Sequence, residues 1–362
     1  MIPLFKVGMS DEAQVRVSQV LASGFIGQGA VVEEFEDALQ NELYTKTRPV
    51  TVNSCTAAID LALELIGVGA DDEVITTPQT CFASNIHIIH RKARIRWADI
   101  DPITGLIDPV SVKKLITSKT KAIVAVNWAG KFADYDTLRT FGVPVIEDAA
   151  HTWDSFIAEG NLYRARGDYI CYSFQAIKFL TSADGGMLIC PPEKEADARI
   201  LRWYGLDRTK NESFRCTQNI TAVGFKYHMN DVNAAIGICN IPVARNSVIK
   251  SRSNSKYIID NVDNPLLTLP EWDETNSYWL FSMHVEVGLK DHFTQYLKDH
   301  NITASPVHFR NDRYDTTIKF ADGVLPGVDS FTDTQICIPN GFWLSKTDLN
   351  HIVTVLNNYT GL

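Results

Sequence analysis

The sequence of 362 residues lacks the short signatures of several large enzyme classes. It contains no G-x-x-x-x-G-K-Ser/Thr phosphate loop, no G-x-G-x-x-G after a first strand, no G-x-S-x-G elbow and no H-E-x-x-H pair. Each of these motifs carries the binding or catalytic groups of its class. Their absence argues against nucleotide hydrolysis, simple dehydrogenation and zinc proteolysis.

The chain also lacks the segments that direct a protein to or across a membrane. No run of about twenty apolar residues occurs anywhere, which a membrane-spanning helix would need. The first residues, MIPLFKVGMS, have neither the basic start nor the apolar stretch of a signal peptide. We therefore expect a cytoplasmic protein with no membrane partner.

Clustered positive charge is missing as well. The formal net charge is -9 and the pI is near 5.5, whereas a general nucleic-acid surface needs grouped Lys and Arg. With 45% hydrophobic and 21% charged residues, the composition is that of an ordinary globular protein. We expect no nucleic-acid partner.

A metal site has little support in the sequence. The seven cysteines are odd in number, widely spread and without a CxxC pair, so they are expected to be reduced thiols. His87 and His90 lie three residues apart and could share one helical face, but no acidic or Cys partner stands near them. A structural or surface role is the better interpretation, and no metal is expected.

Helical and strand patterns alternate through the first two-thirds of the chain. The run TAAIDLALELIGVG has apolar residues at helical spacing followed by glycines, and DEVITTP after it begins a β-branched strand. This alternation predicts an α/β fold with a mostly parallel sheet flanked by helices. Further strands are predicted in ARIRWADID, TKAIVAVNWAG, VPVIEDAA, DYICYSF and GGMLICP.

The pattern changes after NAAIGICNIPVARN. We place a domain boundary near Pro242, which gives a large domain over 1–242 and a smaller α+β domain over 243–362. The second part is expected to contain a long helix over 245–262 and extended runs such as SYWLFSMHVEV.

Two predicted strands deliver chemically useful residues at their carboxyl ends. In VPVIEDAAHTWDS the apolar run ends at Asp148, and His151 follows one short turn later. In DYICYSFQAIKFL the strand ends at Ser173, and Lys178 lies in the loop beyond it. Open α/β sheets bind ligands at this edge, so we expect these side chains to share a site.

A third stretch supplies an anion site. In VNSCTAAIDLAL a strand end leads through Cys55 and Thr56 into a helix, whose first backbone N–H groups and nearby hydroxyls can bind a phosphate. A phosphate cradle, a carboxylate and one lysine match the needs of pyridoxal phosphate. Lys178 would bond to its aldehyde, and Asp148 would keep its ring nitrogen protonated.

At these residues the sequence resembles the DegT/DnrJ/EryC1/StrS sugar aminotransferases, a family of fold type I pyridoxal phosphate enzymes. The resemblance is strong over about residues 20–245 and weaker beyond. Six motifs carry it in the order and at the spacings usual in the family: NSCTAAIDLAL, DDEVITTPQTCFAS, WADIDPITGLIDP, VIEDAAHTWDS, SFQAIKFLTSADGGML and GFKYHMNDVNAAIGI.

The resemblance implies roles for the residues around the cofactor ring. Lys178 would form the covalent link to the cofactor and act as general acid and base in the reaction. Asp148 would pair with the pyridine nitrogen, Phe82 would stack on the ring, and His151 would lie beside it.

The same resemblance implies how the cofactor phosphate is held. The hydroxyl of Ser173 and the backbone around Cys55 and Thr56 would bind it. The family commonly has Asn or Arg where KYHMND has His228, a position that reaches the cofactor phosphate of the neighbouring subunit. A homodimer with shared active sites is therefore expected.

The substrates implied are L-glutamate as amino donor and a nucleotide-linked keto sugar as acceptor, with a 4-keto-6-deoxy hexose the commonest type in the family. The substrate loop of the family matches SGFIGQGAVVEEFEDAL, in which Gly27 and Gly29 permit a close backbone approach. Arg310 and Arg313 are the candidates to hold the diphosphate.

Two alternatives stay open at this point. One is a related sugar dehydratase that uses the same cofactor but has histidine at the lysine position, which the presence of Lys178 disfavours. The other is a non-catalytic cofactor-binding regulator on the same fold, which would be expected to have lost the lysine or the aspartate.

Overall fold

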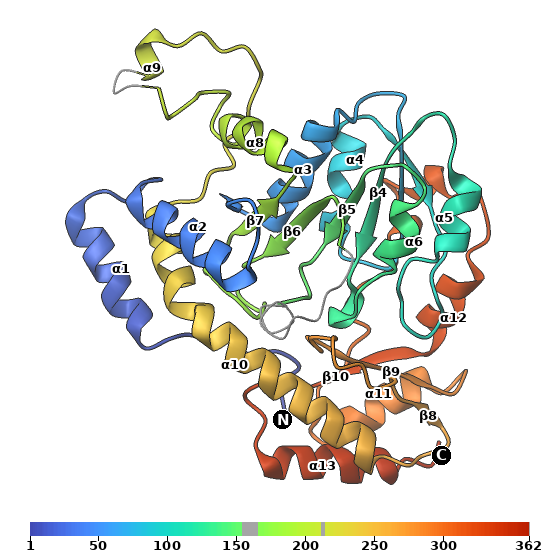
Figure 1. Ribbon diagram of the computed structural model, residues 1–362. Coiled ribbons are helices and arrows are strands. Elements are labelled where there is room, and N and C mark those ends of the chain that lie inside the picture. The colour runs from blue at the N-terminus through green and yellow to red at the C-terminus, as the bar shows by residue number, and fades with distance from the viewer. Residues whose placement is uncertain (154–165, 211–213, 362) are drawn as a thin grey trace.

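The computed structural model describes residues 1–153, 166–210 and 214–361, and a seven-stranded sheet forms its centre (Figure 1). The strand order is β1-β7-β6-β5-β4-β2-β3, and β7 runs antiparallel to both of its neighbours while the other pairs are parallel. The predicted mostly parallel sheet is confirmed. The strands are β1 Val50–Val52, β2 Glu73–Thr76, β3 Arg94–Trp97, β4 Thr120–Val126, β5 Val145–Asp148, β6 Tyr169–Ser173 and β7 Gly186–Ile189.

Helices cover both faces of this sheet, and one long helix, α10, extends from α1 and α2 to α13 at the far end of the molecule (Figure 1). No helix of the described ranges is both long and apolar enough to cross a membrane. The helices are α1 Glu12–Ser23, α2 Ala30–Leu43, α3 Cys55–Ile66, α4 Ile86–His90, α5 Pro109–Leu115, α6 Tyr135–Arg139, α8 Glu195–Leu201, α9 Phe214–Thr217, α10 Asp231–Asn261, α11 Lys290–Asp299, α12 Pro326–Thr334 and α13 Lys346–Asn357.

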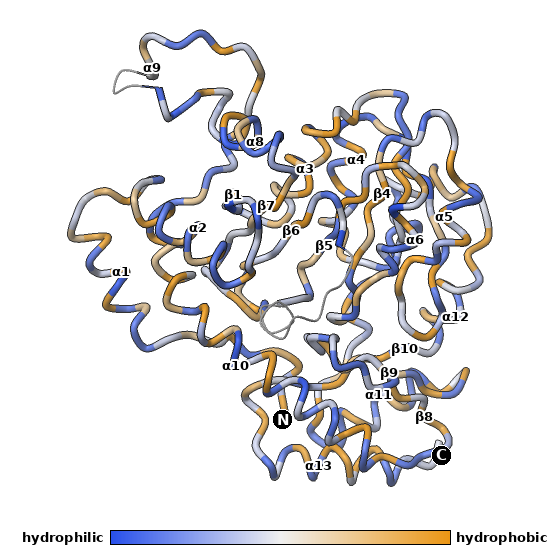
Figure 2. Tube along the Cα trace, viewed as in Figure 1, coloured by the Kyte–Doolittle hydropathy of each residue, from blue (hydrophilic) through white to orange (hydrophobic). Residues whose placement is uncertain are grey.

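Strand β4 shows why the inner part of a central strand is apolar at successive positions, as its colour in Figure 2 indicates. Ala122 and Val124 belong to the buried cluster that includes α3 and α4, whereas Ile123 and Ala125 belong to the cluster that includes α5 and α6. Successive side chains of a strand point to opposite faces, so a sheet covered on both sides needs apolar residues at both.

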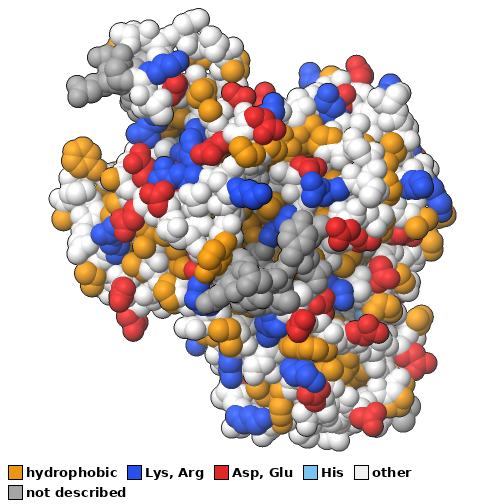
Figure 3. Space-filling view, viewed as in Figure 1, with side chains coloured by type: hydrophobic (Ala, Val, Ile, Leu, Met, Phe, Trp, Pro, Cys, Tyr) orange, Lys and Arg blue, Asp and Glu red, His pale blue; other side chains and the backbone are white. Residues whose placement is uncertain are grey.

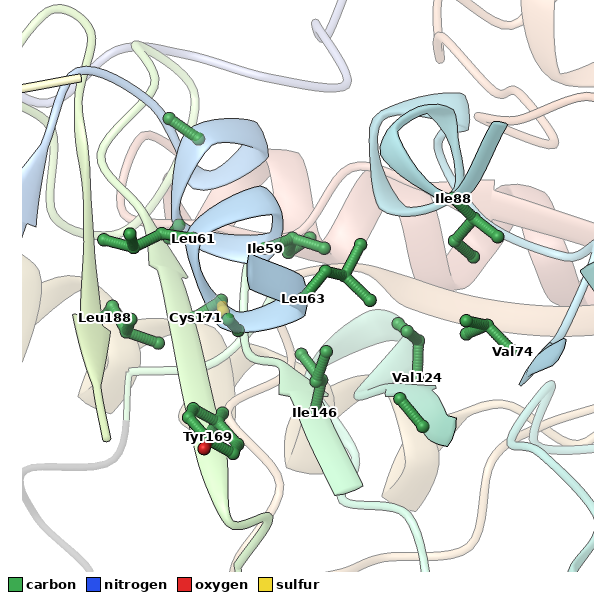
Figure 4. Close-up of a cluster of buried hydrophobic side chains, with 14 of the residues drawn as sticks. Ile59, Leu61, Leu63, Val74, Ile88, Val124, Ile146, Tyr169, Cys171 and Leu188 are labelled. Atoms are coloured by element: carbon green, nitrogen blue, oxygen red, sulfur yellow. The ribbon is translucent and has the colours of Figure 1, made fainter. Parts of the chain in front are cut away.

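Helix α3 packs on the core of the sheet, and its first turn lies beside the cleft at the sheet edge. Ser54 caps its first turn by accepting a hydrogen bond of 3.1 Å from the backbone of Ala57, and Gly67 ends it with a positive φ of 81°. Its buried face packs on the sheet, with Leu63 opposite Val124 and Ile146 (Figure 4). The start of α3 is therefore fixed against the strand ends.

The C-terminal part has its own small antiparallel sheet in the order β10-β9-β8, packed with α11 and α13 (Figure 1). The expected smaller α+β unit is thus present. Helix α10 continues through Pro242 to Asn261, and the boundary at that proline stays a prediction. The strands are β8 Leu267–Thr268, β9 Phe281–Val285 and β10 Gln335–Ile338.

Candidate active site

A cleft of about 500 Å³ opens at the carboxyl ends of β5 and β6, beside the first turn of α3. This is the edge of an α/β sheet where ligands bind. Six of the residues singled out from the sequence line it together, although they come from three separate segments: Cys55, Thr56, Asp148, His151, Ser173 and Lys178.

Lys178 lies in the loop after β6, and its half-buried side chain lines the cleft. Its Nζ is 3.6 Å from the centroid of the Trp279 ring. Burial lowers the pKa of Lys178 to about 8, although the carboxylate of Asp148 opposes this change. Near neutral pH the free amine is therefore much more accessible than in an ordinary lysine, which suits a nucleophile and proton carrier.

Asp148 ends β5 and is almost completely buried. Its Oδ2 accepts a hydrogen bond of 2.6 Å from the hydroxyl of Ser84, and its Oδ1 accepts one of 3.0 Å from the backbone of Ala150. Burial raises the pKa of Asp148, and these two hydrogen bonds oppose that change. A cationic ring N–H beside this carboxylate would stabilise its charged form, so the residue fits a protonated pyridine.

The phosphate end of such a cofactor fits the start of α3. The first N–H groups of a helix, here those of Cys55 and Thr56, have no partner within the helix. Gly186 of β7 lies against this turn, because a Cβ there would come within 2.5 Å of the Cys55 nitrogen. Ser173, at the end of β6, adds a hydroxyl to the same cleft. Together they form a site for an anion.

Aromatic rings surround His151. Its ring stacks on Trp279 with centroids 4.1 Å apart, and the edge of Trp128 lies 5.7 Å away. Burial, with the positive charge of Lys178, lowers the pKa of His151 well below its usual value, so the ring is neutral. Nδ1 of His151 is buried and finds no hydrogen-bond partner among the described residues, which fits a polar ligand in the cleft that His151 lines.

Two predicted cofactor contacts lie outside the residues that line the cleft. The ring of Phe82 packs edge-on against Tyr314 at 5.3 Å, and stacking of Phe82 on the cofactor stays a prediction. His228 forms a bridge with Val52 at the end of β1, and its ring lies 3.6 Å from that of Trp203. Its action on a partner's cofactor stays a prediction.

The two glycines of the predicted substrate loop also lie outside this lining. The N–H of Gly29 donates a hydrogen bond of 2.7 Å to Asp231, and a Cβ at Gly29 would come within 2.8 Å of that carboxylate. Gly29 thus has a structural reason for its lack of a side chain. Gly27 has open space around it. Their contact with substrate stays a prediction.

The two arginines proposed for the diphosphate differ in accessibility. Arg310 is 4% exposed and pairs with Asp312 at 2.6 Å and with Asp329. Arg313 is exposed, and its guanidinium lies 3.5 Å from Asp329. Neither lines the cofactor cleft, and of the two Arg313 is more readily available to a ligand.

Three residues of the cleft were missed in the sequence analysis. Ser84 stands two positions after Phe82 in the motif TCFAS, so its place in a motif already assigned to the cofactor site was a usable signal. Trp279 and His308 come from the C-terminal half and reach the cleft through tertiary contacts. Burial, with the charge of Lys178, lowers the pKa of His308 to about 4, so this ring is neutral too.

The comparison with known families agrees with this geometry. The sequence model of the DegT/DnrJ/EryC1/StrS aminotransferase family matches residues 8–357. The chain belongs to this family. It is similar to AtS13 from Actinomadura melliaura, with 34% identity and a TM-score of 0.91 over 99% of both chains. It is also similar to the sugar aminotransferase CalS13 from Micromonospora echinospora, with 31% identity and a TM-score of 0.90 over 99% of both chains.

The cofactor follows from the family. Its members use pyridoxal phosphate, and the putative sugar aminotransferase Spr1654 from Streptococcus pneumoniae, a fold relative with 23% identity, is known in PLP and PMP forms. The PMP form of Spr1654 matches this chain with a TM-score of 0.88 over 99% of this chain and 98% of that one. The predicted cofactor and the predicted aminotransferase class are therefore confirmed for this family member.

Proposed function

We propose that this aminotransferase moves an amino group from L-glutamate to a nucleotide-linked keto sugar, most typically a 4-keto-6-deoxy hexose, and so makes an amino sugar for glycan or polysaccharide synthesis. The observation that carries the proposal is the meeting of Lys178, Asp148 and the start of α3 in one cleft. The presence of the lysine and the aspartate in that cleft disfavours both the dehydratase and the non-catalytic regulator.

Different residues of the chain have different roles in the proposed reaction. When bound, pyridoxal phosphate supplies an aldehyde that bonds amines and a ring that stabilises negative charge on the adjacent carbon. Asp148 holds the proton on the ring nitrogen. The Nζ of Lys178 would take the proton from the α carbon of the donor and deliver it to the cofactor carbon on the other side of the amino nitrogen, and its pKa of about 8 suits both directions.

A second set of residues would hold the cofactor so that its ring stays next to Lys178. The N–H groups of Cys55 and Thr56 and the hydroxyl of Ser173 bind the phosphate, while the neutral ring of His151 packs beside the cofactor and excludes water. Burial raises the pKa of the Cys55 thiol well above its usual value, so this thiol is neutral and adds no negative charge near the phosphate.

A sugar as acceptor is supported by the similarity to CalS13, which is described as a sugar aminotransferase. The nucleotide diphosphate would need a cation beyond the cofactor cleft, and Arg313 offers an exposed guanidinium there, with Arg310 behind it in ion pairs. Gly27 and Gly29 would let the loop before α2 approach the substrate closely.

We further propose a homodimer in which each active site uses residues of both chains. Apolar side chains are exposed on α1 and the turn after it, where Phe25 is 81% and Val15 is 61% exposed, and Figure 3 shows hydrophobic side chains gathered over this region. A second copy would cover them. His228 would then act on the phosphate held by the partner.

The decisive experiment supplies the enzyme with 15N-labelled glutamate and a panel of GDP-, UDP- and dTDP-linked keto sugars. Mass spectrometry of the products should find the label on one class of nucleotide sugar. Labelled alanine and aspartate serve as control donors. Transfer of the label to free keto acids alone, with every sugar unchanged, would contradict the proposed acceptor.

A further inference from the structure

Trp279 reaches the cleft from the C-terminal part of the chain, two residues before β9. The backbone on each side of it is anchored: Leu280 donates a hydrogen bond of 3.3 Å to Ala129, and the carbonyl of Tyr278 accepts one of 2.7 Å from Asn340. Its own Nε1 donates a hydrogen bond of 3.0 Å to the carbonyl of Ile177. The indole is thus tied to the residue directly before Lys178.

Two planar rings stack on the indole. Phe5 stacks on Trp279 with centroids 5.2 Å apart and an interplanar angle of 27°, and His151 stacks on it at 4.1 Å and 24°. The indole is 6% exposed. A buried ring with this many contacts has one orientation, so its face presents a fixed surface to the cleft.

The amine of Lys178 lies 3.6 Å from the centroid of that fixed ring. An ammonium over an indole face is attracted by the negative face of the ring, and a neutral amine is attracted much less. The other ionisable groups that face Lys178 are the carboxylate of Asp148, which favours its charge, the thiols of Cys55 and Cys81, and the neutral rings of His151 and His308.

We propose that Trp279 is a positioning residue for Lys178: its ring face holds the ammonium form in the cleft and thereby sets the pH at which the free amine becomes available. The residue contacts the catalytic amine and neither gains nor loses a proton.

The test measures the protonation of Lys178 in the full-length chain freed of cofactor. Trace labelling with acetic anhydride at a series of pH values, read by peptide mass spectrometry, gives the pH midpoint of each lysine. Two variants are compared, Trp279→Phe and Trp279→Met. Both lose the hydrogen bond to Ile177 and have similar volumes, but only phenylalanine keeps an aromatic face.

The expected result is a lower midpoint for Lys178 in Trp279→Met than in Trp279→Phe, by about 0.4 to 1.5 pH units if the full strength of the ring interaction is lost. Uptake of added pyridoxal phosphate at low pH, followed by absorbance, should be faster in Trp279→Met than in Trp279→Phe, because more of the Lys178 amine is then free. Lys346, which lies 3.4 Å from the ring centroid of Tyr257 far from the cleft, is the internal standard. Tyr257→Leu is the matched control and should leave the midpoint of Lys178 unchanged.

Equal midpoints in the two variants, or a higher one in Trp279→Met, would overturn the inference. If Trp279→Met does not fold by circular dichroism, Trp279→Leu takes its place in the comparison. The inference rests on the proposed role of Lys178 for its consequence in the reaction. The midpoint is measured without any substrate. The inference about Trp279 can therefore be contradicted while the proposed sugar transfer is confirmed, and the sugar transfer can be contradicted while the inference is confirmed.

Discussion

The hydroxyl of Ser84 donates a hydrogen bond of 2.6 Å to Oδ2 of Asp148, and a second hydroxyl, that of Thr80, lies 2.9 Å from Ser84. The three side chains form a buried chain that ends on the carboxylate. Since burial raises the pKa of Asp148, this donor is one of the groups that keep the carboxylate charged and fix its direction.

Ser84→Ala should therefore weaken the reaction without removing the fold. A hydrogen bond to a charged group contributes about 1.5–3 kcal/mol, so the glutamate half-reaction should slow roughly 10- to 100-fold. Asp148 should hold its proton to a higher pH, and the acidic limb of the rate profile should move upward. Ser84→Thr keeps the hydroxyl and should keep most of the rate. Coincident pH profiles for the alanine variant and the wild type would exclude this role.

Asp148→Asn should separate catalysis from cofactor binding. The amide keeps the size of the carboxylate but cannot stabilise a proton on the ring nitrogen. Loss of one member of a buried charged pair costs about 2–5 kcal/mol, so the half-reaction with glutamate should fall at least roughly 30-fold. The dissociation constant for the cofactor should change much less. Stopped-flow absorbance measures the first quantity and equilibrium dialysis the second, and an unchanged half-reaction rate would refute the assignment.

Lys178→Ala should abolish transamination, because the covalent anchor and the proton carrier are lost together. General acid–base catalysis by one side chain contributes about 10²- to 10⁴-fold, and loss of the covalent anchor adds to that deficit. The cofactor should still bind through its phosphate contacts. Lys178→Arg, which keeps the charge but not the nucleophilic amine, should be as inactive. Activity is assayed in buffer without primary amines, and appreciable turnover there would show that another group does the chemistry.

The main sheet could be predicted because its central strands are covered on both faces and therefore carry consecutive apolar residues, as in the last five residues of TKAIVAV. The positions of Asp148 and Ser173 followed from the same reasoning, since a polar residue directly after such a strand lies at the ligand-binding edge. Lys178 stood out because the run around it has no other basic residue.

Residues from the C-terminal half could not be placed in this way. Trp279 precedes a strand in a second sheet, and nothing in SYWLFSMHVEV indicates that its ring turns toward a cleft in the first.

Arg310 was singled out from the sequence, but its partners could not be predicted. Its charge suggested an anion partner, but two carboxylates on the same segment and on α12 already take it. The residue type gives the charge of a side chain, whereas the ion pairs that it forms depend on the tertiary packing.

Because of Glu36, the free energy of unfolding should decrease at acidic pH. This buried carboxylate pairs with Arg202 at 2.5 Å and Arg199 at 2.7 Å, and although burial opposes it, the pairing lowers the pKa of Glu36 from 4.5 to about 2. Because the folded value is the lower one, the stabilisation of about 3 kcal/mol is complete above pH 4.5 and is lost as pH falls toward 2.

Glu36→Gln should remove this acid dependence and lower the free energy of unfolding by about 3–5 kcal/mol near neutral pH, because Arg202 stays buried without its charged partner. Glu34→Gln is the control: Glu34 is exposed and pairs with Arg16 on the surface, so its loss should cost less than about 1 kcal/mol. Urea unfolding at pH 7 and pH 3 measures both. Equal effects of the two substitutions would contradict the importance of the buried pair.

The shared active site can be tested by mixing two defective chains. Lys178→Ala removes the catalytic amine, and His228→Glu places a carboxylate where the proposed dimer has the partner's phosphate, so each variant should be nearly inactive by itself. Light scattering should first show particles of twice the 40.4 kDa chain mass.

If His228 serves the partner, a mixed dimer holds one site with both defects and one intact site. Random mixing should then restore about a quarter of the wild-type activity, since half of the dimers are mixed and half of their sites work. If His228 instead serves its own chain, every site of a mixed dimer carries one defect, and activity stays at the level of the separate variants. The restored fraction thus distinguishes an exchanged contact from a local one even though both arrangements are dimers.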